Sequence, residues 1–151
     1  MRFEQTRDVL NHIGAFHKQA GALYAELKAH CSSSRVRLLL DYIARHELNL
    51  EKNIASYRDN LSESLLSSWF KYTHDQDIFA ALKEVDREKD MPFDDVLDLA
   101  LELDGKLVEL YQEMMERSTS AEVKDIFNSL LLQEMKEKQT LVRNALGLMD
   151  I

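Results

Sequence analysis

The stretch DVLDLALELDGKLVELY, residues 95–111, repeats the stretch DVLNHIGAFHKQAGALY of residues 8–24 at an offset of 87 positions (111 minus 24). The two copies begin with the same three residues and end with the same two. Four further identities follow at this offset: Glu26 with Glu113, Ser33 with Ser120, Val36 with Val123, and Glu47 with Glu134. Nine identities at one offset indicate two copies of one helical hairpin, related by a pseudo-twofold axis.

Apolar residues recur at helical spacing throughout both copies. This spacing predicts four long helices, at about residues 3–30, 34–59, 93–117 and 121–147. Residues that cap helix N-termini separate the helices of each pair: Ser32, Ser33 and Ser34 in the first hairpin, and Ser118, Thr119 and Ser120 in the second. Pro92 suits the first turn of the third helix, and Gly147 suits the end of the fourth. We therefore expect an all-α four-helix bundle made of two antiparallel hairpins.

The two hairpins are joined by a long crossover, residues 60–92, in which we expect short helices near residues 61–72 and 77–85. This connection must carry the chain from one end of the bundle to the other, which is the connectivity of ferritin-like folds. We expect Trp69, Phe70 and Tyr72 to cover the side or an end of the bundle; the alternative is a patch that binds a partner.

Length and composition favour one domain, residues 1–151, in the cytoplasm. A chain of 151 residues can bury one core, and four glycines and one proline favour helix. The net charge of -8 and the lack of a Lys/Arg stripe argue against nucleic acid as a partner. No segment is of signal-peptide type or approaches the roughly 20 apolar residues of a membrane span. Cys31 is the only cysteine, which leaves no disulfide and no cysteine-based metal site.

Polar residues interrupt the inward apolar stripes of the four helices: His17, Glu47, Asp104, Glu134 and Glu137. The repeat pairs His17 with Asp104 and Glu47 with Glu134, so we expect all five residues in one cross-section of the bundle. Buried carboxylates repel one another, and protonation, a basic partner or a bound cation must compensate. The alternatives are that helix rotation leaves Asp104 or Glu137 half exposed, or that His17 as imidazolium pairs with Glu47. His46 falls outside this layer and is expected to be solvated.

The sequence resembles the rubrerythrin branch of the ferritin-like superfamily. In that family each hairpin supplies a Glu, a Tyr seven residues later, and a Glu-x-x-His motif on the following helix. In this chain the first Glu is replaced by His17 before Tyr24, and by Asp104 before Tyr111. The motifs read Glu47-Leu48-Asn49-Leu50 and Glu134-Met135-Lys136-Glu137. Both motif glutamates are present, and both motif histidines are replaced.

The resemblance implies a dinuclear metal site bridged by Glu47 and Glu134. One metal position would be held by His17 and these two glutamates, without the ligand that the motif histidine gives. The other would be held by Asp104 and Glu137 with the same two glutamates. An all-oxygen site suits manganese or another divalent cation as well as iron.

Two functions remain open at this point. The first is a ferritin-like metal-binding protein that holds iron or manganese, with oxidoreductase activity on peroxide or dioxygen at a modified dinuclear site. The alternative is a metal-free, degenerate ferritin-like bundle that acts as a dimerisation or partner-binding module, with no metal cofactor. Whether the chain is an enzyme stays undecided. In both cases we expect a homodimer, formed through exposed apolar faces.

Overall fold

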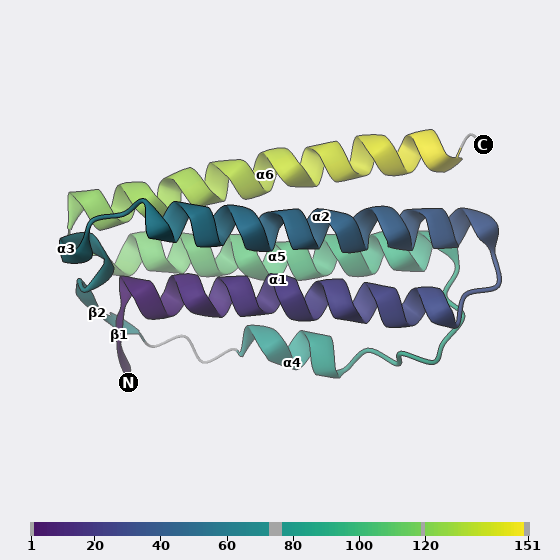
Figure 1. Ribbon diagram of the computed structural model, residues 1–151, viewed down its shortest axis with the longest axis horizontal. Helices are drawn as coiled ribbons and strands as arrows, with labels where there is room; N and C mark the ends of the chain where they lie inside the picture. The colour runs from purple at the N-terminus through teal and green to yellow at the C-terminus, as the bar shows by residue number, and fades with distance from the viewer. Residues whose placement is uncertain (1, 73–76, 119, 150–151) are drawn as a thin grey trace.

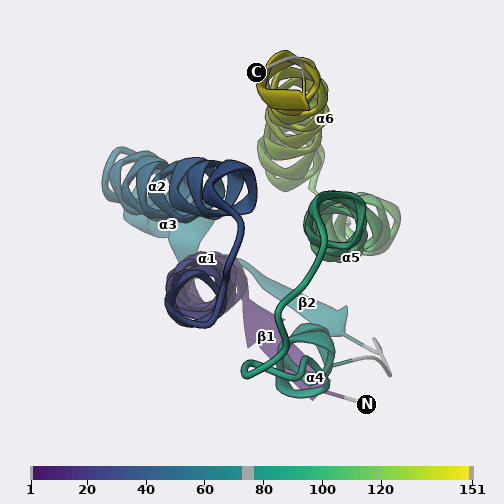
Figure 2. The same ribbon diagram turned by 90° about the vertical axis from the view of Figure 1, so that its right-hand side faces the viewer.

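The computed structural model describes residues 2–72, 77–118 and 120–149. Four long helices form a bundle: α1 (Thr6–Ala29), α2 (Ser34–Asp59), α5 (Phe93–Arg117) and α6 (Ala121–Met149). The pairs α1–α2 and α5–α6 lie side by side as two antiparallel hairpins (Figures 1 and 2). The predicted four-helix bundle is confirmed, and each long helix begins and ends within three residues of the expected position.

Serine side chains cap the second helix of each hairpin. The Oγ of Ser33 accepts the backbone N–H of Val36 at 3.3 Å, and the Oγ of Ser120 accepts that of Val123 at 3.4 Å. Each bond satisfies an N–H group that has no acceptor within the first helical turn. The repeat in the sequence is therefore also a repeat of capping geometry. Thr119, which we expected in the second turn, lies outside the described residues.

Pro92 and Gly147 lie close to helix ends but not where we expected them. Pro92 is the N-cap of α5 and precedes its first turn, which contains Asp94 and Asp95. These carboxylates interact favourably with the positive end of the helix dipole. Gly147 does not end α6, which continues to Met149. No described glycine has the positive φ of a left-handed helix stop, so this prediction was wrong.

The crossover contains two short helices and one strand: α3 (Glu63–Leu66), β2 (Trp69–Tyr72) and α4 (Ile78–Lys83). β2 pairs antiparallel with β1 (Arg2–Gln5), with Gln5 opposite Trp69. We expected the first long helix to begin near residue 3 and a short helix to reach residue 72. Both expectations were wrong, because these residues lie in β1 and β2. Two segments that are distant in the sequence satisfy each other's backbone groups here, and aromatic residues suit such a ribbon.

The ribbon lies at the end of the bundle where α1 begins (Figure 1). The side chain of Trp69 is 62% exposed there, so it does not cover the bundle as we expected. The side chains of residues 70 and 72 lie outside the described part of the structure. None of the described helices is long and apolar enough to cross a membrane.

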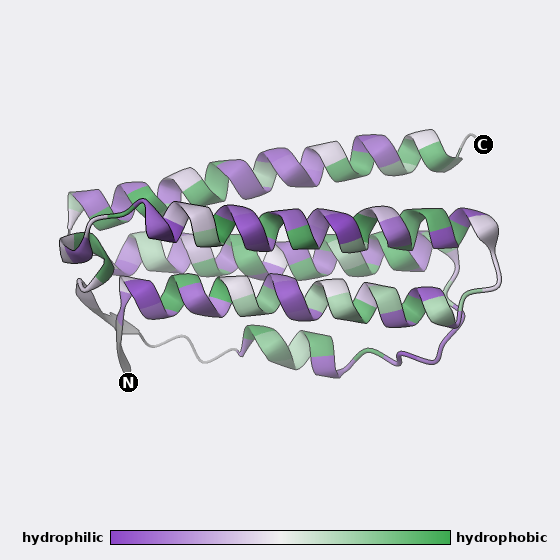
Figure 3. Ribbon diagram, in the orientation of Figure 1, coloured by the Kyte–Doolittle hydropathy of each residue, from purple (hydrophilic) through white to green (hydrophobic). Residues whose placement is uncertain are grey.

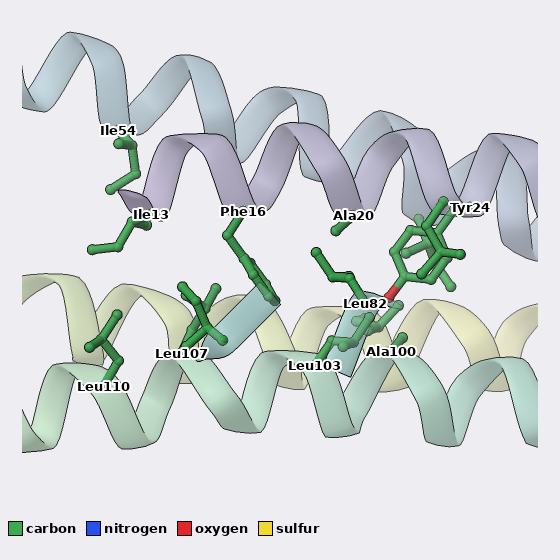
Figure 4. Packing of buried hydrophobic residues seen from close by; sticks show 14 of the residues in the cluster. Ile13, Phe16, Ala20, Tyr24, Ile54, Leu82, Ala100, Leu103, Leu107 and Leu110 are labelled. Carbon is green, nitrogen blue, oxygen red and sulfur yellow. The ribbon is translucent and has the colours of Figure 1, made fainter. Parts of the chain in front are cut away.

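The core lies between the two hairpins. Ile13 and Phe16 of α1 face Leu107 and Leu110 of α5 (Figure 4). Leu82 of α4 closes the same layer from below, where α4 lies along α1 and α5 (Figure 2). Hydrophobic and hydrophilic segments alternate along each long helix (Figure 3), the pattern of helices with one buried face. Burial of this apolar face is the main favourable term that holds the hairpins together.

Candidate functional site

Three carboxyl groups and one imidazole lie buried inside the bundle, one from each long helix. Their exposed fractions are 1% for His17 in α1, 3% for Glu47 in α2, 4% for Asp104 in α5 and 3% for Glu134 in α6. The helical period of the sequence predicted an inward position for all four. Because three of them are carboxyl groups, the layer cannot be dry and fully ionised without a large cost in free energy.

His17 and Glu47 form one pair across the first hairpin. The Nδ1 atom of His17 lies 2.7 Å from the Oε2 atom of Glu47, which is hydrogen-bond distance. An imidazolium here would neutralise the carboxylate, and a neutral imidazole would donate its Nδ1–H to it. In both cases Glu47 has a partner inside the protein, as one of the sequence alternatives proposed.

Asp104 and Glu134 form the corresponding pair across the second hairpin. Their side chains are joined by a hydrogen bond, which two carboxyl groups make only when one of them carries a proton. Burial, followed by the charge of Glu47, raises the pKa of Asp104 to about 8. Burial and the charge of Asp104 raise the pKa of Glu134 well above its usual value. The pair therefore holds at least one proton at neutral pH.

Two buried oxygen atoms of this layer have no hydrogen-bond partner in the described structure: Oε1 of Glu134 and the hydroxyl of Tyr24. Burial, with the nearby charges of Glu47 and Asp104, raises the pKa of Tyr24 well above 10. Burial also raises the pKa of Tyr111, with Glu134 as the next cause. Both tyrosines therefore stay as neutral phenols beside the carboxyl groups. Unpartnered buried oxygens are uncommon in native proteins, and each of these can take a water, a hydrogen-bond donor or a cation as its partner.

Glu137, the fifth predicted member, lies at the margin of the layer. Its side chain is 30% exposed, and its Oε2 lies 3.6 Å from Nε2 of His46. His46 is only 11% exposed and stacks on Tyr42, with ring centroids 6.0 Å apart. The expectation that His46 is solvated was therefore wrong. The period of α2 alone missed it, because α6 lies over this side of α2 and covers the ring.

A small cavity lies next to the layer, with a volume of about 10 Å³. It has room for about one water-sized species. Its lining includes His17, Leu50, Asn53, Tyr111, Gln133 and Glu134. Leu50 stands where the first Glu-x-x-His motif would have its histidine. The space therefore lies on the side of the layer where the resemblance implied a metal position with a missing ligand.

The described side chains do not meet at one point. No group of three or more His, Cys, Asp or Glu side chains within residues 2–72, 77–118 and 120–149 has an arrangement that could hold a metal ion. The donors are instead satisfied mainly in two pairs, His17 with Glu47 and Asp104 with Glu134. A shared ion would need at least one of these side chains to turn.

Comparison with known proteins supports the fold. No protein-family model and no curated protein matches the chain. Among solved structures, a crystal structure from Thermotoga maritima superposes with a TM-score of 0.60 over 95% of each chain, at 17% sequence identity. That protein has been assigned provisionally as a ferritin-like diiron-carboxylate protein. The present chain thus has a ferritin-like fold.

Proposed function

We propose that this ferritin-like bundle binds a divalent metal ion in its buried polar layer, through Glu47 and Glu134 with His17 and Asp104. The observation that carries the proposal is the unpartnered Oε1 of Glu134, which is buried among three other ionisable side chains. The chemistry of the donors fits a divalent cation, since carboxylate and imidazole are its usual ligands. The structural likeness to a provisionally assigned diiron-carboxylate protein supports the same proposal.

A cation would replace the proton that the raised pKa values of Asp104 and Glu134 favour. The proton neutralises one negative charge, whereas a divalent ion neutralises two and gives Glu134 Oε1 a partner. Lys138 is the cation whose charge lowers the pKa of Asp104, and it does not reverse the effect of burial. Three ionised carboxylates in the layer would therefore carry more negative charge than the described basic side chains neutralise.

Glu137 extends the donor set if its side chain turns away from His46. This rearrangement exchanges a partly buried contact of 3.6 Å with His46 for a position in the layer. The resulting set has one imidazole and four carboxylates, which suits iron or manganese. Such an ion would supply redox chemistry toward peroxide or dioxygen, which makes an oxidoreductase the activity to test first. Within the ferritin-like fold, the resemblance carried by Glu47, Glu134 and the two tyrosines supports the rubrerythrin branch.

The test is the metal content of the purified protein after expression with added iron or manganese, measured by mass spectrometry. The parent should carry near-stoichiometric metal, and the Glu47→Gln/Glu134→Gln variant should lose it. Glu51→Gln/Glu122→Gln is the matched control, with one change on α2 and one on α6 outside the layer, and it should bind as the parent does. Equal, trace metal in all three proteins would reject the proposal.

A second candidate is a metal-free bundle that serves as a dimerisation or partner-binding module. The observation that favours it is the pairing of all four buried side chains with one another, without a three-ligand group among the described residues. In this case the Glu47→Gln/Glu134→Gln variant should be at least as stable as the parent, because amides pair with less desolvation cost than carboxylates.

A further inference from the structure

The outward side of α6 carries a regular apolar stripe. Seven large hydrophobic side chains are exposed among the described residues, and four of them lie on α6: Leu132, Met135, Leu146 and Met149. Gln139 and the half-buried Val142 complete a series with spacings of 3, 4, 3, 4 and 3 residues. This is the heptad spacing of a helix that packs along its length against another helix.

This stripe is not used by the bundle itself. The residues of α6 that are buried in the core are Val123, Ile126, Phe127, Leu130, Glu134, Leu141 and Ala145. At 3.6 residues per turn, the centre of the stripe lies roughly a third of a turn away from them. Apolar residues also recur along α6 to its C-terminal end (Figure 3). The helix therefore has a second apolar side that no described residue covers fully.

A parallel stripe runs along α5. It consists of Leu101, Gly105, Val108, Gln112 and Met115, with spacings of 4, 3, 4 and 3 residues. Val108 lines a groove of about 450 Å³ together with Met135, Lys138, Gln139 and Val142 of α6. The two stripes therefore adjoin and form one surface, which we call the α5–α6 face. α1 and α2 lie on the opposite side of the α5–α6 pair (Figure 2).

Gly105 is a second, independent feature of this face. A glycine inside a helix costs about 1 kcal/mol relative to alanine. No contact among the described residues requires it, because a Cβ atom built at Gly105 meets none of their atoms within 4 Å. A glycine in such a position allows the backbone of another helix to approach closely. The residue is therefore explained if a further helix packs on the α5–α6 face.

We propose that a second copy of this chain packs on the α5–α6 face. The charges at its two edges identify the occupant. The α5 edge is acidic and exposed: Asp98, Glu102, Glu109 and Glu116. The C-terminal half of the α6 edge is basic and exposed: Lys136 and Arg143. No ion pair within the described residues involves any of these six side chains.

A twofold axis parallel to the helices makes this face complementary to itself. Such an axis lays α5 of one copy over α6 of the other, so the acidic edge of each meets the basic edge of its partner. Acidic residues of α5 and basic residues of α6 also lie at matching heights along the bundle axis. The groove places Val108 beside Met135 and Gln139, so the neighbouring Glu109 lies near the level of Lys136. Two turns earlier on α5, Glu102 lies near the level of Arg143, because α5 and α6 are antiparallel.

The first test is the oligomeric state of the full chain by sedimentation equilibrium at micromolar concentration. The parent should be a dimer, and Met135→Glu/Leu146→Glu should raise the dissociation constant by about tenfold or more, because each change charges a buried seam. The matched control is Leu38→Glu/Leu48→Glu, which adds the same charge at exposed leucines of α2 and should leave the dissociation constant unchanged. A monomeric parent, or a dimer that only the α2 control dissociates, would overturn the proposal.

A second pair of variants tests the orientation without removing apolar surface. Glu102→Lys/Glu109→Lys and Lys136→Glu/Arg143→Glu should each weaken the dimer, and the protein carrying all four changes should regain it. Gly105→Leu should block the close approach while the monomer keeps its thermal stability, since the site is open. If the protein with all four charge changes does not regain the dimer, the twofold arrangement is wrong.

Discussion

The carboxyl pair of Asp104 and Glu134 should make the metal-free protein sensitive to pH. Burial raises the pKa of Asp104 from its usual 3.8 to about 8, and the pKa of Glu134 is raised as well. Above about pH 4 the folded chain therefore holds protons that the unfolded chain has released. The stability that these protons give is complete below about pH 4 and is lost as the pH rises toward 8. The slope is about 1.4 kcal/mol per pH unit for each such group.

Denaturant unfolding of chelator-treated protein across this pH range checks the prediction. The Asp104→Asn/Glu134→Gln variant has no titrating pair, so its stability should fall less steeply from pH 4 to pH 8 than that of the parent. Asp41 and Asp90 have lowered pKa values through hydrogen bonds to Lys28 and Ser32. Their contributions are lost only as the pH falls, below the tested range. Equal slopes in both proteins would contradict the pairing.

The hydroxyl of Tyr24 should lower the stability of the metal-free protein. It is fully buried and has no hydrogen-bond partner in the described structure. Removing a buried, unpartnered polar group avoids its desolvation cost, so Tyr24→Phe should raise the free energy of unfolding by about 1 kcal/mol. Urea unfolding with a chelator present measures this. Tyr42→Phe is the control, since its hydroxyl accepts a hydrogen bond from Nδ2 of Asn144 at 2.7 Å, and it should give no gain.

The sequence predicts most single residues of the layer, because a helix interior imposes a strict period. His17, Glu47, Asp104 and Glu134 are all buried, as their positions on the apolar stripes required. Glu137 follows Glu134 by three residues, which places it about 60° further around the helix. A helix that centres Glu134 on the core must leave Glu137 at the margin. Whether the side chain of Glu137 turns inward or toward His46 depends on the neighbouring helix α2. The apolar period of α6 carries no information about that helix.

The N-cap of α2 is an element-scale feature that can be tested by itself. Ser33 accepts the N–H of Val36 at 3.3 Å. Ser33→Ala should therefore lower the free energy of unfolding by about 1 kcal/mol. Ser34→Ala, at the exposed first residue of the same helix, should change it by less than about 0.5 kcal/mol. Thermal or urea unfolding of both variants makes the comparison; similar losses would show that serine content, not capping, stabilises the turn.

Whole elements differ in how far the sequence predicts them. The four long helices carry their own signal, because many apolar residues define each of them and a capping serine marks the start of α2 and of α6. β1 and β2 do not, since each has four residues and neither has a partner nearby in the chain. Their pairing joins residues 2–5 to residues 69–72 and becomes visible only once α1 and α2 have brought them to the same end.

At the scale of the whole molecule, the polar layer takes one side chain from each of the four long helices. A cation held there would bind the folded bundle and not the unfolded chain. It would therefore add RT ln(1 + [M]/Kd) to the stability, which is about 2.7 kcal/mol at a hundredfold excess over Kd. If residues 1–151 form one domain, as we expect, the whole chain should unfold in a single transition whose midpoint rises with metal concentration.

Differential scanning calorimetry at fixed protein concentration, with manganese(II) or with iron(II) under argon, measures this midpoint. The parent should show a progressive rise in Tm, and Glu47→Gln/Glu134→Gln should show none, because amide oxygens leave the cation uncompensated. The Glu51→Gln/Glu122→Gln control should follow the parent. A Tm that stays constant for the parent at every metal concentration means that the protons and hydrogen bonds of the two pairs already satisfy the layer. The bundle would then act as the metal-free scaffold, and its α5–α6 face would be the surface left to carry a function.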